Sequence, residues 1–210
     1  MIRTFIAYDN NDFELGDYFD DSHTDIIDEI VANKLIQRTS ISGLECTEVK
    51  VNECIQAFNG LRFVFVGLSH GNEQQLISNE AFVSATNAAA FTNSFFYTCA
   101  CSTGDQLGGV LIEAGCLVYI GYNDTVLLHV DYYQVFYKCQ NFGIKSFLLN
   151  KETINVSFDK MIAYYNEEIE RLVNEGGTDE VIASSFLLSN RDGLILLGNG
   201  NLTPNDFFAN

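Results

Sequence analysis

Basic residues are scarce in this chain. Lys and Arg number 11 against 28 Asp and Glu, which gives a formal net charge of -17 over 210 residues. A surface this acidic repels phosphate backbones and anionic membranes, so we expect neither a nucleic-acid partner nor a membrane partner. It would favour basic partners or substrates, although an acidic surface commonly serves solubility alone.

Long apolar runs are also missing. No segment approaches the roughly 18 uninterrupted apolar residues of a membrane span. Residues 1–9 lack the apolar stretch of a signal peptide. We therefore expect a cytoplasmic protein whose cysteines are reduced thiols. The Cys99-x-Cys101 spacing fits neither a thioredoxin motif nor a usual zinc site, so we expect no metal and no other cofactor.

Proline is nearly absent, since Pro204 is the only one, and no Pro- or Gly-rich linker divides the chain. Nearly half of the residues, 47%, are hydrophobic, which is ample for a buried core. We expect a single domain over residues 1–210. The helical stretch at about 130–190 is long for one crossover connection, and we interpret it as a helical insertion.

Apolar runs alternate with segments of helical periodicity along the chain. This order predicts an α/β fold with a mostly parallel sheet that is covered by helices on both faces. Residues 73–79 fit either a short hairpin strand or a loop. The expected strands are 3–9, 44–51, 61–69, 94–101, 116–122 and 194–197, and the expected helices are 23–37, 80–92, 105–114, 130–149, 155–174 and 178–190.

Two of the expected strands end abruptly in polar residues. The run 63–68 is followed by Ser69-His70-Gly71, and the run 95–100 is followed by Cys101-Ser102-Thr103-Gly104. The carboxyl ends of parallel strands are where such sheets bind ligands. Adjacent strands of this kind would bring a thiol and an imidazole to one edge, which is the minimum for a cysteine nucleophile.

Each of these residues also has a structural interpretation. A lone histidine is commonly a surface or core residue, yet His70 is better placed than His23 or His129. Free cysteine commonly behaves as a small buried hydrophobe. Cys101 differs because it precedes a predicted helix start at residue 105, where the helix N-terminus would stabilise a thiolate. Cys99 is a rival nucleophile two residues earlier.

The glycine-rich segment 102–109 allows another interpretation, a phosphate-binding loop. It lacks both the Gly-Lys-Ser/Thr core and the Gly-x-Gly-x-x-Gly fingerprint of nucleotide-binding loops. It contains Asp105 and no basic residue. The sequence therefore favours cysteine chemistry over anion binding.

Together these motifs resemble the caspase-like cysteine peptidases, a group that includes caspases, gingipains, separases and CHAT domains. The resemblance rests on Ser69-His70-Gly71 and on Ala100-Cys101-Ser102-Thr103-Gly104, and the second motif looks most like that of CHAT-domain proteases. Segments 107–122 and 196–200 also look like that group. The resemblance implies a caspase-like three-layer sandwich with about six strands.

It also implies a mechanism. Cys101 would be the nucleophile, His70 the acid/base, and the backbone N–H groups of Gly71 and Cys101 the oxyanion hole. The substrate would be a protein. A regulated protease of this kind, in a bacterial defence or cell-death pathway, would have an activating protein partner.

The charge of the substrate pocket sets specificity in relatives. The loop after the first strand contains Asp9 and Asp12 and no basic residue, and Asp124 follows the fifth expected strand. An acidic pocket would pair with a cationic side chain, so we expect cleavage after Arg or Lys. The alternative is an Asx-rich turn with solvated charges.

Two other functions stay open from the sequence. One is a catalytically silent caspase-like module that serves assembly. The other is an unrelated α/β domain that binds a small anion. A dyad in the sequence does not by itself establish activity.

Overall fold

The computed structural model describes residues 1–208. Its centre is a six-stranded sheet with the strand order β2-β1-β3-β7-β8-β9. Neighbouring strands are parallel, except that β9 runs antiparallel to β8. The strands are β1 (Ile2–Tyr8), β2 (Ile36–Ser42), β3 (Phe63–Leu68), β7 (Ser94–Thr98), β8 (Val118–Tyr122) and β9 (Leu194–Gly198).

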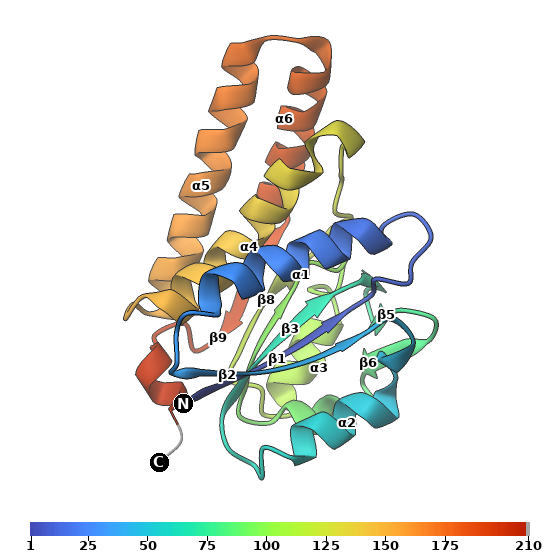
Figure 1. Ribbon diagram of the computed structural model, residues 1–210, viewed down its shortest axis with the longest axis vertical. Coiled ribbons are helices and arrows are strands. Elements are labelled where there is room, and N and C mark those ends of the chain that lie inside the picture. The colour runs from blue at the N-terminus through green and yellow to red at the C-terminus, as the bar shows by residue number, and fades with distance from the viewer. Residues whose placement is uncertain (209–210) are drawn as a thin grey trace.

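Helices cover both faces of this sheet, with α1 and α4 on one side and α2 and α3 on the other (Figure 1). Every residue of β3, β7 and β8 is buried, as expected for parallel strands between two helical layers. The predicted mostly parallel sheet of about six strands, with helices on both faces, is confirmed. The helices are α1 (Gly16–Ile30), α2 (Glu48–Gln56), α3 (Leu107–Glu113), α4 (Tyr133–Leu149), α5 (Ile154–Glu175) and α6 (Thr178–Asp192).

The three long helices expected after residue 130 are present as α4, α5 and α6. α5 and α6 lie side by side and extend beyond the end of the sheet (Figure 1). Their buried side chains Tyr165 and Leu187 belong to the same hydrophobic cluster as Val66 and Tyr97 of the sheet. A single domain with a helical insertion stays a prediction.

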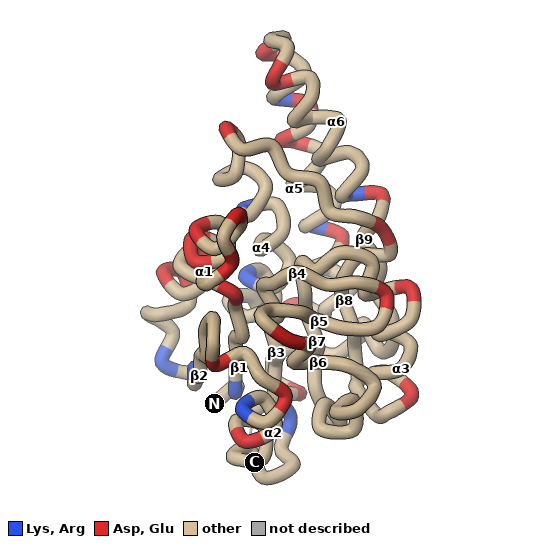
Figure 2. Tube along the Cα trace, turned by 90° about the vertical axis from the view of Figure 1, so that its right-hand side faces the viewer, with Lys and Arg blue, Asp and Glu red and all other residues tan. Residues whose placement is uncertain are grey.

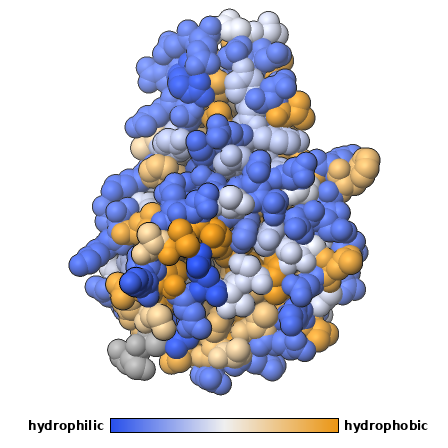
Figure 3. Space-filling model, in the orientation of Figure 1, coloured by the Kyte–Doolittle hydropathy of each residue, from blue (hydrophilic) through white to orange (hydrophobic). Residues whose placement is uncertain are grey.

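The surface reflects the acidic composition. Acidic residues lie on most of the helices and in the loops, and they gather along α1 (Figure 2). On the face drawn in Figure 3, hydrophobic residues form small groups on the part that contains the sheet, and the projecting helical end is mostly hydrophilic. Within residues 1–208, no helix has the length and apolar character to cross a membrane.

A second, smaller sheet lies beside the carboxyl end of β3. It consists of β4 (His70–Asn72), β5 (Gln75–Ile77) and β6 (Ala81–Ser84), all antiparallel. The helix expected at 80–92 is therefore wrong. The Asn87 side chain accepts from Ser84 N–H and donates to the Phe82 carbonyl, so it closes a turn where a helix would have continued.

The strand expected at 44–51 is also wrong. The true edge strand is β2, in which only Ile36 and Ile41 are buried, so its sequence carries little strand signal. Residues 43–45 form a short 3₁₀ turn, and α2 begins at Glu48. Thr47 caps α2, since its Oγ1 accepts from Lys50 N–H at 3.2 Å.

The first helix begins earlier than its periodicity predicted. α1 starts at Gly16, whereas the helix was expected from residue 23. Tyr18 and Phe19 are buried in its first turns, although the sequence around them is rich in Asp. Burial of this aromatic pair therefore extends the helix toward the carboxyl edge of the sheet.

Candidate active site

His70 is separated from the buried strand β3 by Ser69 alone and takes the first position of β4. The next residue, Gly71, packs against the segment that carries Cys101. A Cβ added at Gly71 would lie 2.8 Å from Ala100 Cβ and 3.0 Å from Thr103 Cγ2. Glycine is therefore required here for close approach of two chain segments, which brings the His70 strand against the Cys101 turn.

Cys101 lies in a tight turn after β7. Ser102 has a positive φ of 55°, which is strained for a residue with a side chain. The turn is tied to β8 and the loop after it, because Ser102 N–H donates to the Asp124 carbonyl and Gly104 N–H donates to the Tyr122 carbonyl. These bonds hold the thiol-bearing residue at the carboxyl edge of the sheet.

The thiol is not at a helix N-terminus as expected. α3 begins only at Leu107, six residues after Cys101, and residues 101–106 are turns. Instead, the Cys101 Sγ accepts a hydrogen bond from Val126 N–H at 3.3 Å. The polar partner of the thiol is therefore a backbone N–H of the loop after β8, where a helix terminus was expected.

Cys101 and His70 line one small cavity. Within residues 1–208, no hydrogen bond joins the two side chains, and the Cys101 N–H has no acceptor. Catalytic hydrogen bonds are often long before substrate binds. A free N–H at the nucleophile itself is what an oxyanion hole needs.

Asp12 contacts the imidazole. His70 Nε2 lies 3.3 Å from Asp12 Oδ2, and the His70 side chain is 43% exposed. The other oxygen, Oδ1, accepts from Glu14 N–H and Leu15 N–H at 2.9 and 2.7 Å. With Nε2 turned toward Asp12, Nδ1 is the ring nitrogen left to act as a base.

Opposing effects set the pKa of Asp12. Burial acts to raise it, whereas the N–H donors of Leu15 and Glu14 and the neighbouring His70 lower it, and the net pKa lies below its ordinary value. Asp12 is therefore ionised near neutral pH. The ring of Phe19 packs edge-on against the imidazole at 5.7 Å, which further fixes its plane.

The structure places the other two candidate acids away from this cavity. Asp9 is buried, and its Oδ1 accepts from Asn11 N–H within the same turn. Asp124 is exposed, and its Oδ1 accepts from Thr125 N–H at 2.7 Å. Neither side chain lines the cavity that His70 and Cys101 share. Each of these two carboxylates accepts a hydrogen bond from a backbone N–H of its own turn.

The rival nucleophile Cys99 is buried beside Cys101. Burial and the neighbouring Cys101 raise the pKa of its thiol to about 12. Burial likewise raises the pKa of Cys46 to about 12. Thiols with such pKa values stay protonated and unreactive near neutral pH. The half-buried Cys101 is the better candidate for nucleophilic chemistry.

The glycine-rich segment does not form an open cradle for an anion. A Cβ at Gly104 would lie 2.5 Å from Ile195 Cδ1 and 2.9 Å from the Tyr122 carbonyl. Gly108 packs equally closely against the Tyr119 ring. These glycines permit tight packing of chain segments. In the part of the chain that the structure describes, no cluster of three or more His, Cys, Asp or Glu is placed to hold a metal ion.

Comparison with solved structures shows that the chain has a known fold. The crystal structure of the Arg-specific cysteine proteinase gingipain R (RGPB) matches 96% of this chain with a TM-score of 0.60 and 15% sequence identity. The fold is caspase-like. The match covers 47% of the gingipain chain, so this caspase-like chain spans about half of that protein's length. No protein-family model and no curated protein matches the sequence.

The caspase-like architecture predicted from the motifs is thus confirmed, and it is the fold of a cysteine peptidase. At this identity the comparison supports the fold alone. A specific closeness to CHAT-domain proteases stays a prediction.

Sequence reasoning missed two features of the site. The sequence pattern assigns Asp12 to a substrate pocket, whereas in the structure it contacts His70. Gln140 was not considered, yet this residue of α4 lines the cavity. The cluster of acidic residues around Asp12 is a weak sequence signal for its contact with His70. Nothing in the sequence marked Gln140, because only the packing of α4 on α1 brings it to the site.

Proposed function

We propose that this chain is a cysteine endopeptidase that cleaves a protein substrate through Cys101 and His70. The observation that carries the proposal is that both side chains line one cavity at the carboxyl edge of a caspase-like sheet, with Asp12 on His70. A thiol, an imidazole and a carboxylate that orients the ring are the parts of a nucleophile–base–orienter constellation.

The chemistry runs in two steps. His70 Nδ1 takes the thiol proton as the Cys101 Sγ bonds to the substrate carbonyl carbon, and His70 returns that proton to the leaving amine as the C–N bond breaks. Water then attacks the resulting thioester, with His70 as its base, which releases the carboxylic acid and restores the thiol. The N–H groups of Cys101 and Gly71 would stabilise the oxyanion in both steps.

A catalytically silent interaction module is the second candidate. The intact dyad and the Asp12–His70 pair favour the enzyme, because an exposed imidazole held by a carboxylate beside a half-buried thiol has no evident packing role. Small-anion binding has less support, since Gly104 and Gly108 are packed against β8 and β9.

Three finer expectations remain predictions. These are cleavage after Arg or Lys, activation by a protein partner, and a role in bacterial defence or cell death. Gingipain R is described as Arg-specific. In this chain, however, Asp12 is engaged by His70, and Asp9 and Asp124 lie outside the shared cavity, so the geometry gives a basic preference no support.

The test is a diverse peptide library incubated with the purified protein, with cuts mapped by mass spectrometry. Cys101→Ala and His70→Ala should abolish the cuts. Cys54→Ala is the matched control, since Cys54 is a partly exposed thiol on α2, on the opposite face of the sheet, and it should cut as the parent does. Cuts that survive Cys101→Ala would contradict the proposal.

A further inference from the structure

The cavity that Cys101 and His70 share is very small. Its volume is about 30 Å³, which is about the volume that a single water molecule occupies in the liquid. Within residues 1–208, no Asp, Glu, Lys or Arg lines it. Large side chains from the start of α1 and from the loop after β8 form much of its wall, and these wall residues are Leu15, Tyr18, Phe19, Val126 and Leu128.

A substrate bound for cleavage would bring one of its side chains to this cavity. The attacked carbonyl carbon must lie at the Cys101 Sγ, and the side chain of the same residue begins on the adjacent carbon. His70 must lie beside the leaving amine of the same bond. The space that Cys101 and His70 both line is therefore within reach of the first atoms of that side chain.

Buried contacts hold the part of the wall that comes from α1. Tyr18 and Phe19 are buried, and their rings pack edge-on with centroids 5.7 Å apart. The Tyr18 ring also packs edge-on against Tyr133 of α4 at 5.0 Å. The Tyr18 hydroxyl donates to Gln140 Oε1 at 2.5 Å, so turning Tyr18 aside would leave a buried acceptor without its donor, which is unfavourable. This side of the cavity therefore resists widening.

The part of the wall that comes from the loop after β8 is held by α6. Asn190 of α6 is buried, its Oδ1 accepts from Leu127 N–H at 2.8 Å, and its Nδ2 donates to the Leu127 carbonyl at 2.7 Å. The preceding N–H, that of Val126, donates to the Cys101 Sγ at 3.3 Å. Leu127 lies between Val126 and Leu128, so these bonds keep both wall residues of the loop in place.

We infer that this cavity restricts cleavage to bonds in which glycine or alanine supplies the carbonyl group. This inference rests on the proposed peptidase function. A methyl group is about as large as a water molecule, so the cavity admits the side chain of alanine or the hydrogen of glycine. A larger side chain would press further atoms against walls that are held in place, and such overpacking is unfavourable.

The experiment measures kcat/KM for peptides that differ only in the residue on the carbonyl side of the cleaved bond. The series contains Gly, Ala, Ser, Val, Leu, Asp and Arg at that position, in a flanking sequence that the diverse library shows to be cut. We expect Gly and Ala to be the two best residues, and Ala to exceed Val and Leu by on the order of a hundredfold, since one methylene group in a pocket is worth roughly 10–200-fold.

Leu128→Ala tests the cavity itself. It shortens a wall side chain, so it should bring kcat/KM for the Val peptide to within about tenfold of that for the Ala peptide. Leu15→Ala enlarges the cavity from the start of α1 and is a second, independent enlargement if Leu128→Ala does not fold. Leu127→Ala is the matched control, because it makes the same change in the same loop at a side chain that does not line the cavity. It should keep the parent's order of preference.

The outcomes separate the inference from the proposed function. Cys101-dependent cleavage that prefers Leu, Asp or Arg, or that shows no preference at this position, overturns the inference and leaves the peptidase intact. An Ala/Val ratio that neither folded enlargement changes, or that Leu127→Ala changes equally, also overturns it. Cleavage of none of these peptides or of the diverse library, or cleavage that Cys101→Ala does not affect, overturns the proposed function and the inference with it.

Discussion

The two faces of the central sheet are built on different principles. Under α2 and α3, rings pack against rings, with Phe65 centroids 4.7 Å from Phe96 and 5.0 Å from Phe91. Under α1, α4 and α5, buried tyrosines bring hydroxyl groups into the core. Tyr18 donates to the Gln140 side chain, Tyr97 to the Gln140 carbonyl, and Tyr122 pairs with Tyr165.

The difference shows which face of the sheet requires particular side-chain partners. Packing on the first face is mainly apolar, although the buried Tyr119 hydroxyl there donates to Thr103 Oγ1 at 2.8 Å. On the second face each buried hydroxyl requires a partner, because a buried polar group without one is costly. The candidate site lies on this second face, so its polar core is also the framework that positions α1 and α4 around Cys101.

The largest expected effect on stability comes from a substitution on the apolar face of the sheet. Phe65→Ala should lower the free energy of unfolding by about 3–5 kcal/mol, because it empties a position that is surrounded by rings. Urea denaturation measures this change. If the two faces have separate roles, the proposed peptidase activity per folded molecule stays unchanged, and a loss of that activity in the folded variant would contradict the comparison.

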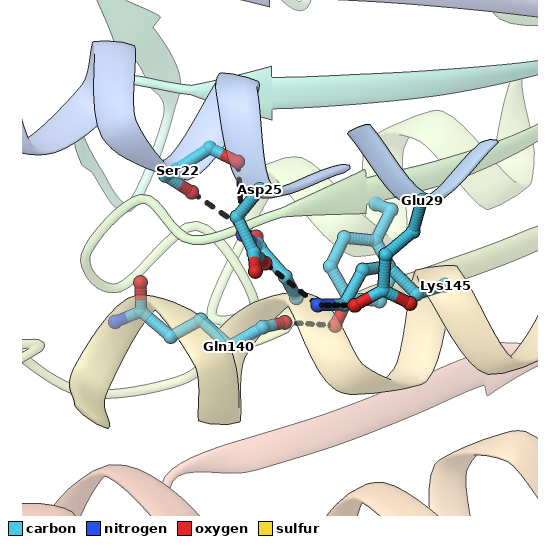
Figure 4. A network of polar contacts seen from close by, with 7 residues as sticks. Ser22, Asp25, Glu29, Gln140 and Lys145 are labelled. Carbon is cyan, nitrogen blue, oxygen red and sulfur yellow. Dashed lines mark hydrogen bonds and ion pairs between the residues drawn. The ribbon is translucent and has the colours of Figure 1, made fainter. Parts of the chain in front are cut away.

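The next effect concerns the ion pairs between α1 and α4 (Figure 4). Lys145 Nζ lies 2.8 Å from Asp25 Oδ2 and 2.7 Å from Glu29 Oε1, and its side chain is 9% exposed. Lys145→Ala should cost roughly 2–3 kcal/mol, less than a fully buried pair because Glu29 is half exposed.

Lys160→Ala is the matched control for Lys145→Ala. Lys160 pairs with Glu152 at 2.6 Å, but its side chain is 46% exposed. An exposed pair contributes about 0–1 kcal/mol. Equal losses for the two lysine variants, measured by the same denaturation, would show that burial of the Lys145 network does not matter.

A smaller effect on stability is expected when one of two hydrogen-bonded tyrosine hydroxyls is removed. The Tyr122 and Tyr165 hydroxyls lie 2.9 Å apart in the core. Either Tyr→Phe change leaves one buried hydroxyl without this partner and should cost about 1–2 kcal/mol. The double variant should cost less than the sum of the two, since no orphaned hydroxyl remains. Strict additivity in thermal unfolding would argue against the pairing.

The smallest effect is a pH dependence at Asp12. Its pKa is depressed in the folded state, so its contribution to stability is full above the unfolded pKa of about 3.9 and is lost as pH falls through the lower folded value. The difference in unfolding free energy between the parent and Asp12→Asn should therefore be constant at neutral pH and shrink below about pH 4. A difference that grows toward low pH would contradict this sign.

The sequence predicted the elements whose signal is local. β3, β7 and β8 are buried throughout, so their apolar runs identified them, and the strand ends located His70 and Cys101. The edge strand β2 was missed because tertiary pairing with β1, and not its own composition, defines it. The three-residue strand β4 is too short to leave a pattern, whereas β5 lies within residues 73–79, where the sequence allowed either a short hairpin strand or a loop.

The rest of the site depends on contacts that no local pattern encodes. Asp12 reaches His70 only because the loop before α1 folds across the carboxyl edge of the sheet. Gln140 reaches Tyr18 from 122 positions away in the chain. Such pairings follow from helix packing, and sequence periodicity alone specifies neither partner.

The two residues of the proposed dyad are held by different sheets. Cys101 follows the central strand β7, whereas His70 opens a small sheet that meets the Cys101 turn through the contact of Gly71 with Ala100 and Thr103. The relative position of the two side chains therefore depends on the contact between the small sheet and the Cys101 turn. On heating, we expect this contact to open before the central sheet unfolds. The temperature of inactivation should then lie below the temperature at which the secondary structure is lost.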